Sequence, residues 1–243
     1  MLNYRVDPAL LQDRVPAGTV LDPHAGEHWV SLVGFLFEDT ALLGVPVPLH
    51  RNFEEVNLRF YVARDVPDEA RGEPQRRGVA FVKEIVPRGA IAALARLIYN
   101  ENYVSLPMKH RLLQNGRRVS SDTELLDGTR VEFDWGRGAA QGRLAGTVSG
   151  APQLSEPGSH RHYITEHYWG YAAQRDGGTV EYEVEHPPWQ VWDARGPTFT
   201  APVSSLYGPE WEPVFAREPD SAFFADGSEV TVKQGRRIDL EER

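Results

Sequence analysis

The chain of 243 residues contains no cysteine and only three lysines, against 23 arginines. The lack of cysteine excludes disulfides and thiolate metal ligands, and it is typical of a cytoplasmic protein, so we expect that location. The sequence has neither a secretory leader nor an apolar run long enough to cross a bilayer, so we expect no membrane partner. The net charge of −9 is unfavourable for nucleic acid, and we expect no nucleic-acid partner.

Short stretches in which apolar and polar residues alternate make up most of the chain. A period of two is typical of strands with one buried face, and glycine, proline, asparagine and aspartate separate the stretches. We therefore expect a mainly β fold. The expected strands cover residues 28–37, 53–62, 78–86, 128–135, 179–186 and 228–235.

Two segments depart from this pattern. Residues 88–100 carry apolar side chains at helical spacing on one face, which predicts the main helix. Residues 138–160 are rich in glycine, serine and proline, and we expect a long exposed loop there. Both flanks of this loop are strand-like and no repeat is visible, so we expect a single domain over residues 1–243.

Three polar residues share one face of the expected strand 53–62. Glu55, Asn57 and Arg59 alternate with apolar residues, and alternate residues of a strand lie about 6.6–6.8 Å apart. If this face lines an interior, the three side chains can orient a carboxylate or polarise a carbonyl, Arg59 through its planar guanidinium. If the face lies outside, the three are simply solvated, and alternation alone does not distinguish the two cases.

Lys109 is the candidate nucleophile. It follows Pro107 and Met108, directly after the expected helix, and a lysine attacks a carbonyl only as the neutral amine, which requires a lowered pKa. In a strand, His110 faces away from Lys109 whereas Arg111 shares its face, so Arg111 can supply the neighbouring cation that lowers this pKa. The alternative is an ordinary solvated lysine.

Three histidines suggest a metal site, but their spacing argues against one. His160 and His162 share a face of an extended segment, whereas His167 lies at odd separation from both. Three nitrogen ligands therefore do not converge, and we expect no metal.

The expected strand 179–186 has an apolar face that ends at His186. Its other face carries Glu181, Glu183 and Glu185, which we expect to point into solvent. A lone histidine on an apolar face is more often a packed core residue than a ligand. The chain also has no phosphate loop, dinucleotide fingerprint, nucleophile elbow or zinc-protease motif, so we expect no cofactor.

An ordered series of motifs resembles the YqjF-like family of uncharacterised bacterial proteins. The series is "YRVDPALLQDRVPAGTVLD", "HWVSLVGF", "FEEVNLRFYV", "GVAFVKEIV", a helix, "LPMKHRL", "YITEHYWGY" and "EHPPWQVW". It covers nearly the whole chain. The family is grouped with acetoacetate decarboxylase, so the resemblance implies a closed, mainly antiparallel β-barrel with a few helices and an internal cavity.

The resemblance also bears on the candidate site. In acetoacetate decarboxylase one of two adjacent lysines forms a Schiff base with the substrate ketone, in a pocket that also holds an arginine and a glutamate. Here Met108 and Lys109 occupy the corresponding positions, so one lysine of the pair is missing and decarboxylation is in doubt. The family pattern favours an inward-facing stripe. Three later residues also fit the family motif, namely Glu166, Tyr168 and His186, and the resemblance implies that they either line the cavity or brace it. His167 departs from the pattern, which tends to carry arginine at this position.

Together these features predict a protein that binds a small organic acid or carbonyl compound in a barrel cavity. The polar contacts would be Glu55, Asn57, Arg59 and Lys109. Arg59 would hold the acid group, Glu55 would orient Arg59 or carry a proton, and Lys109 would donate to the carbonyl or condense with it. Whether turnover follows is open. The alternatives are a non-catalytic binding or accessory module and a structural component that assembles as a homo-oligomer.

Overall fold

The computed structural model describes residues 1–38, 41–42, 45–46, 52–87, 102–121, 123–138 and 140–238. The helix expected over residues 88–100 lies outside the described residues. In the part of the chain that is described, no helix is both long and apolar enough to cross a membrane.

Strands dominate the described residues, which confirms the mainly β fold. The strands are β1 (Leu2–Val6), β2 (Val20–Leu21), β3 (His28–Phe37), β4 (Ala41–Leu42), β5 (Val45–Pro46), β6 (Phe53–Arg64), β7 (Arg76–Val86), β8 (Tyr103–Ser105), β9 (Met108–Gln114), β10 (Arg117–Val119), β11 (Arg130–Arg137), β12 (Ala140–Leu154), β13 (Trp169–Ala173), β14 (Thr179–Glu185), β15 (Gln190–Thr200), β16 (Ser221–Ala225), β17 (Thr231–Val232) and β18 (Arg236–Arg237). The described α-helices are α2 (His160–Thr165), α3 (Val203–Leu206) and α4 (Glu212–Phe215), and the 3₁₀ turns are η1 (Pro8–Leu10), η2 (Gln12–Arg14) and η3 (Pro209–Trp211).

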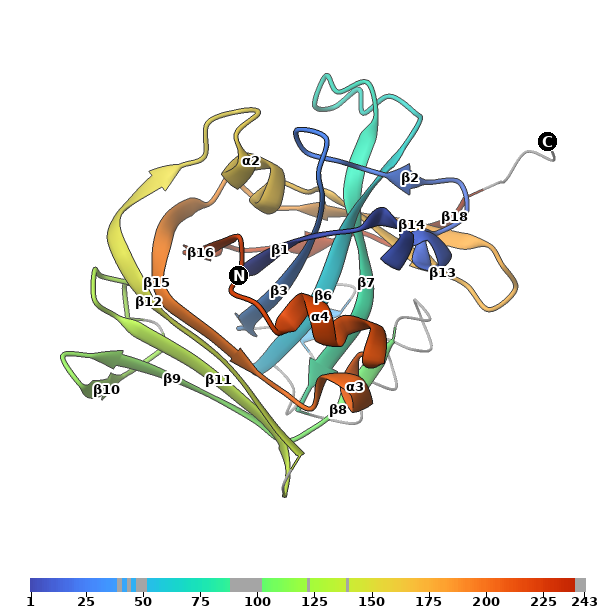
Figure 1. The fold of residues 1–243 in the computed structure, drawn as a ribbon. Coiled ribbons are helices and arrows are strands. Elements are labelled where there is room, and N and C mark those ends of the chain that lie inside the picture. The colour runs from blue at the N-terminus through green and yellow to red at the C-terminus, as the bar shows by residue number, and fades with distance from the viewer. Residues whose placement is uncertain are drawn as a thin grey trace.

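One sheet of 16 strands joins both ends of the chain. Its order is β10-β9-β11-β12-β15-β16-β1-β3-β6-β7-β13-β14-β17, with β2, β8 and β18 attached to β6, β7 and β14. Most pairs are antiparallel, and β7 pairs in parallel with β8 and β13. Figure 1 shows β12 and β15 as long curved strands on one side of the molecule, with β3, β6 and β7 running together through its centre.

The sheet curls strongly without closing among the described residues, where its order ends at β10 and β17. The closed barrel expected from the family is therefore not seen. Curvature comes instead from packing between strands that are far apart in the sheet order. A Cβ built on Gly34 of β3 would lie 2.9 Å from the ring of Phe133 in β11 and 3.0 Å from Leu144 in β12. Glycine permits this close approach.

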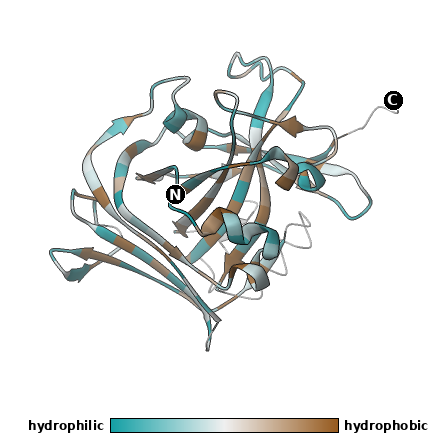
Figure 2. Cartoon of the chain, viewed as in Figure 1, coloured by the Kyte–Doolittle hydropathy of each residue, from teal (hydrophilic) through white to brown (hydrophobic). Residues whose placement is uncertain are grey.

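The main core lies where the curled sheet meets the C-terminal helical turns. The inward face of β6 contributes Val56, Leu58, Phe60 and Val62, all fully buried. Phe133 and Leu144 join them from β11 and β12, and the α3–η3–α4 segment adds Val203, Tyr207 and Trp211. Figure 2 shows hydrophobic (brown) and hydrophilic (teal) segments in turn along the long strands, as expected for strands with one apolar and one polar face.

The long loop expected at residues 138–160 is wrong over most of its length, because Ala140–Leu154 is β12. This strand pairs with β11 on one side and β15 on the other, so its backbone hydrogen bonds are met by strands from distant parts of the sequence. Two of the glycines that suggested a loop, Gly142 and Gly146, lie in close packing contacts. At Gly142 an added Cβ would collide with the ring of Trp135.

The sequence predicted that Glu181, Glu183 and Glu185 of β14 point into solvent, and this prediction is wrong for Glu181. Its carboxylate is fully buried and pairs with Arg64 at 3.1 Å, Arg76 at 2.8 Å and Arg236 at 2.7 Å. These arginines come from β6, β7 and β18, so one carboxylate ties the C-terminal segment to the centre of the sheet. Glu185 of the same strand is 48% exposed and pairs with Lys233 at 2.6 Å.

We expect Glu181→Gln to destabilise the protein by about 3 kcal/mol, because it leaves partly buried guanidinium groups without their counter-charge. Arg64 and Arg76 keep about a fifth of their side chains exposed, which places the cost at the lower end of the range for broken buried pairs. Urea unfolding of both forms measures the difference. Glu185→Gln is the matched control and should stay close to wild type, since surface pairs contribute little. Equal effects of the two substitutions would contradict the role given to Glu181.

Candidate functional site

The polar stripe of β6 is buried. Glu55 is 3% and Asn57 is 2% exposed, so the alternative of a solvated stripe is wrong for these two residues. Asn57 donates from Nδ2 to Oε1 of Glu55 at 3.1 Å. The stripe faces away from Val56 and Leu58, whose side chains enter the main core. Strand β6 is therefore buried on both of its faces.

Helix α2 covers Arg59, the third residue of the stripe. Arg59 donates from Nη2 to the carbonyl oxygen of Ile164 at 2.9 Å, and its guanidinium carbon lies 5.9 Å from the ring centre of Tyr61. The helix begins after Ser159, whose Oγ accepts a hydrogen bond from the backbone N–H of His162. The extended geometry assumed for His160 and His162 is therefore wrong, because this N-cap starts a helix.

His167 joins the stripe from the segment that follows α2. It is 7% exposed, and its ring centre lies 4.8 Å from that of Tyr61. Burial, together with the charges of Arg59 and Arg77, holds the pKa of His167 well below its ordinary value. The ring is therefore neutral near pH 7. Its Nε2 lies 2.5 Å from the carbonyl oxygen of Tyr163 and must donate to it, which leaves Nδ1 as an acceptor.

Three polar atoms here are buried and have no hydrogen-bond partner among the described residues. They are Oδ1 of Asn57, Nε of Arg59 and Nδ1 of His167, that is, two acceptors and one donor. Buried polar groups in native proteins are nearly always paired with protein, water or ligand. Arg59 and His167 both lie against Tyr61, and Asn57 precedes Arg59 by two residues on the same face of β6. We call Asn57, Arg59 and His167 the buried polar cluster, and it is the candidate ligand site. Glu84 of β7, 1% exposed, stands opposite Asn57 in the sheet register.

Lys109 does not reach this cluster. His110 of β9 lies 2.8 Å from Oε1 of Glu54 in β6, so the alternating Lys109 and Arg111 point away from β6. Lys109 is exposed, and Arg111 pairs with acidic residues of β11. The inward position is taken by Met108, which packs against the main core. The prediction that Lys109 meets Glu55, Asn57 and Arg59 in one site is therefore wrong.

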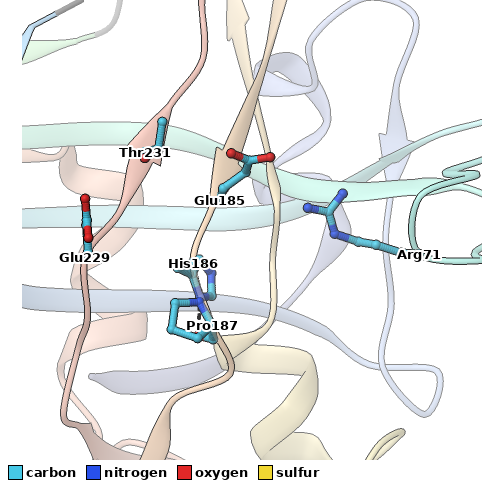
Figure 3. A pocket seen from close by; sticks show the side chains of 6 residues that line it. All are labelled: Arg71, Glu185, His186, Pro187, Glu229 and Thr231. Carbon is cyan, nitrogen blue, oxygen red and sulfur yellow. Dashed lines mark hydrogen bonds between the residues drawn. The ribbon is translucent and has the colours of Figure 1, made fainter. Parts of the chain in front are cut away.

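The remaining predicted residues, Glu166, Tyr168 and His186, meet one another elsewhere. Tyr168 donates to Oε2 of Glu166 at 2.6 Å, and its ring stacks 4.7 Å from that of His186. Trp189 stacks on the other side of His186 at 4.1 Å, and Arg71 lies 4.3 Å above Tyr168. An open surface pocket lies beside this stack (Figure 3). Its lining residues are Arg71, Glu185, His186, Pro187, Glu229 and Thr231.

Metal binding has no support in the described residues, where no three His, Asp or Glu side chains are grouped to hold an ion. Sequence analysis missed His167 as a member of the cluster because strand alternation says nothing of residues that arrive from a neighbouring helix. The available signal was the stripe itself, since a buried amide and a partly buried arginine require polar partners.

A hydrogen-bond chain runs from Tyr61, the next residue after Arg59 on the same face of β6, to His160. Asn3 fixes its direction, because the amide Nδ2 can only donate and Oδ1 can only accept. Asn3 donates to Oγ of Ser221 at 3.0 Å and accepts from Oγ of Ser31 at 2.7 Å. Ser31 has then used its hydrogen, so Tyr61 donates to it. Oγ of Ser221 lies 2.8 Å from Nε2 of His160 and still has its own hydrogen, so we expect Ser221 to donate to Nε2 and His160 to carry its hydrogen on Nδ1.

We expect Asn3→Asp to raise the pKa of His160. A carboxylate at this position accepts from both serines, so Ser221 no longer donates to Nε2, and His160 gains by carrying a second hydrogen near a negative charge. In the wild-type protein burial and the neighbouring His24 lower the pKa of His160. An NMR titration of the imidazole nitrogens measures both the pKa and the tautomer. A wild-type His160 with its hydrogen on Nε2 would contradict the direction of the chain.

His167 should make the protein less stable in acid. Its pKa is lowered on folding, so below the ordinary histidine pKa of 6.5 the unfolded chain binds more protons than the folded one. The stability contributed by this group is therefore present above pH 6.5 and lost as the pH falls. We expect His167→Gln, whose amide can still donate to Tyr163, to flatten the dependence of unfolding free energy on pH. Urea unfolding from pH 7.5 to about 5 tests this, and unchanged slopes would contradict it.

Comparison with known proteins bears out the resemblance seen in the sequence. The chain is 25% identical over 228 residues to the uncharacterized protein YqjF of Bacillus subtilis (strain 168), covering 91% of this chain and 86% of that protein. Acetoacetate decarboxylase from Legionella pneumophila is similar in structure, with a TM-score of 0.59, 14% identity, and coverage of 98% and 83%. The enduracididine biosynthesis enzyme MppR complexed with pyruvate is also similar, with a TM-score of 0.59, 15% identity, and coverage of 97% and 86%. Because the sequence identities to these two enzymes are low, the structural similarity shows only that they share the fold of this chain. Residues 1–229 match the model of DUF2071, described as an uncharacterized conserved protein, and the chain belongs to that family.

Proposed function

We propose that this protein binds a small organic acid or carbonyl compound at the buried polar cluster, without forming a Schiff base at Lys109. The observation that carries the proposal is the set of three unpaired, buried polar atoms on Asn57, Arg59 and His167. A ligand that pairs all three removes a desolvation cost that the protein otherwise bears, and this favours binding.

The three atoms specify the chemistry of the ligand. The Nε–H of Arg59 needs an acceptor, which a carboxylate or carbonyl oxygen supplies. Oδ1 of Asn57 and Nδ1 of His167 need donors, which a hydroxyl group supplies. The buried carboxylates of Glu55 and Glu84 on the same face favour hydroxyl groups over a second acid group. An α-hydroxy acid, or the hydrated form of an α-oxo acid, meets these requirements.

The structural relatives support this ligand class without determining it. MppR is described in complex with pyruvate, an α-oxo acid. The similarity of fold makes a small acid a reasonable first probe for the present chain. The lack of cysteine supports a cytoplasmic location for the binding activity.

A binding assay with paired ligands tests the proposal. We expect lactate or a related α-hydroxy acid to raise the thermal midpoint and to bind more tightly than the matching α-oxo acid. Asn57→Leu and Arg59→Gln should each weaken binding by about ten-fold or more, because a hydrogen bond to a charged group contributes about 1.5–3 kcal/mol. Lys109→Arg is the control and should bind as the wild type does. If a panel of small hydroxy and oxo acids produces no shift, or the stripe variants bind normally, the proposal is wrong.

Borohydride trapping distinguishes binding from lysine chemistry. The chain has only Lys83, Lys109 and Lys233 to modify besides an amino terminus, so peptide mapping assigns any adduct. We expect no adduct with α-oxo acids that is selective for Lys109, because this side chain is exposed and points away from the buried polar cluster. A stoichiometric adduct confined to Lys109, and absent in Lys109→Arg, would restore the Schiff-base enzyme as the better hypothesis.

A further inference from the structure

One outward face of the sheet is strongly basic. Cross-strand pairs place Lys109 opposite Asp134 and Arg111 opposite Glu132. Asp134 stands in turn opposite Arg143 on β12. Leu113 of the same β9 face stands opposite Arg130 of β11 on one side and Arg118 of β10 on the other. We call this set the basic face, and its members are Lys109, Arg111, Arg118, Arg130, Arg143, Glu132 and Asp134.

The two carboxylates of the basic face are each shared by two arginines. Glu132 pairs with Arg111 at 2.7 Å and with Arg130 at 2.9 Å. Asp134 pairs with Arg111 at 3.0 Å and with Arg143 at 2.6 Å. Five cations and two carboxylates leave a surplus of three positive charges. Because the ion pairs hold the guanidinium groups in place, the surplus charge is presented in a fixed arrangement.

The surplus cations are accessible to a partner. Arg143 is 45% and Arg130 is 36% exposed, and Lys109 and Arg118 are exposed as well. Neither Lys109 nor Arg118 lies within ion-pair distance of a carboxylate in the described ranges of the chain. Pairing within the face therefore does not account for these two residues, whose charges remain available.

We propose that the basic face docks an acidic segment of a partner protein. The whole chain carries a net charge of −9, so this face has the opposite sign to the rest of the molecule. A local field of opposite sign orients an acidic partner and raises its association rate. Four of the five cations are arginines: Arg111, Arg130 and Arg143 form ion pairs within the face, and the fourth is Arg118. Arginine is enriched at protein interfaces because its planar guanidinium group can donate two hydrogen bonds to one carboxylate.

The same face is poorly suited to nucleic acid. Glu132 and Asp134 lie within it and would repel a continuous phosphate backbone, whereas a peptide can place its carboxylates selectively. None of the residues that make up the basic face is aromatic, so it offers no platform for stacking bases. The net charge of the chain also repels a long polyanion at a distance.

Binding of a fluorescent peptide of alternating aspartate and glutamate, measured by anisotropy, tests the proposal. The test variant is Lys109→Glu with Arg118→Glu, since these two cations have no carboxylate partner among the described residues. The matched control is Arg175→Glu with Arg237→Glu, which changes the net charge equally on exposed positions outside the face. We expect the test variant to lose about ten-fold or more in affinity and the control less than about two-fold. Circular dichroism confirms that both remain folded.

Three results would overturn the proposal. The wild-type protein could fail to bind the peptide at low ionic strength, where screening is weakest. The control variant could lose as much affinity as the test variant, which would indicate a general charge effect. Duplex DNA of equal charge could bind more tightly than the peptide, which would identify the face as a nucleic-acid site. None of these results depends on the buried polar cluster.

Discussion

Strand β6 is buried on both faces, and this constraint governs the structure around it. An ordinary antiparallel strand places its polar side chains in water, so alternation costs nothing. In β6 the apolar side chains Val56 and Leu58 fill the main core, while Glu55, Asn57 and Arg59 on the opposite face are also covered. Every polar group on that face must find a partner inside the protein. Helix α2 meets part of this requirement through the carbonyl oxygen of Ile164, and the part that it leaves unmet defines the candidate site.

The buried polar cluster differs from Glu181, the buried carboxylate of β14, in how completely its polar atoms are paired. Glu181 is also removed from water, but three arginines and the hydroxyl of Tyr171 surround its carboxylate. A buried charge that is fully paired fixes strands relative to one another and has no capacity left for a ligand. Asn57 and His167, in contrast, each keep an acceptor without a donor among the described residues. Glu181 therefore has a structural role, and the proposal of ligand binding concerns the buried polar cluster alone.

The sequence predicts those parts of the fold that depend on the local hydrophobic pattern. Residues 28–37 and 53–62 fall in β3 and β6, the first because it is a short apolar run and the second because it alternates strongly. Features that depend on distant partners were missed. Strand β12 was taken for a loop because of its glycines, of which Gly142 accommodates Trp135. The burial of Glu181 depends on Arg64 and Arg76, which are more than 100 residues away. For the candidate site, alternation identified the stripe of Glu55, Asn57 and Arg59. It did not predict His167, since α2 and the turn after it bring that residue in.

The position of Lys109 shows how a single residue step decides between two kinds of site. Successive side chains of a strand point to opposite faces, so of the neighbours Met108 and Lys109 only one can face the core. The contact of His110 with Glu54 fixes the register and gives the inward position to Met108, which has no amine. The lysine is left on the outward face beside Asp134 and Arg111, where its charge adds to an array of ion pairs. In this chain the segment that resembles a catalytic lysine pair is therefore better suited to recognition at the surface than to carbonyl chemistry in the interior.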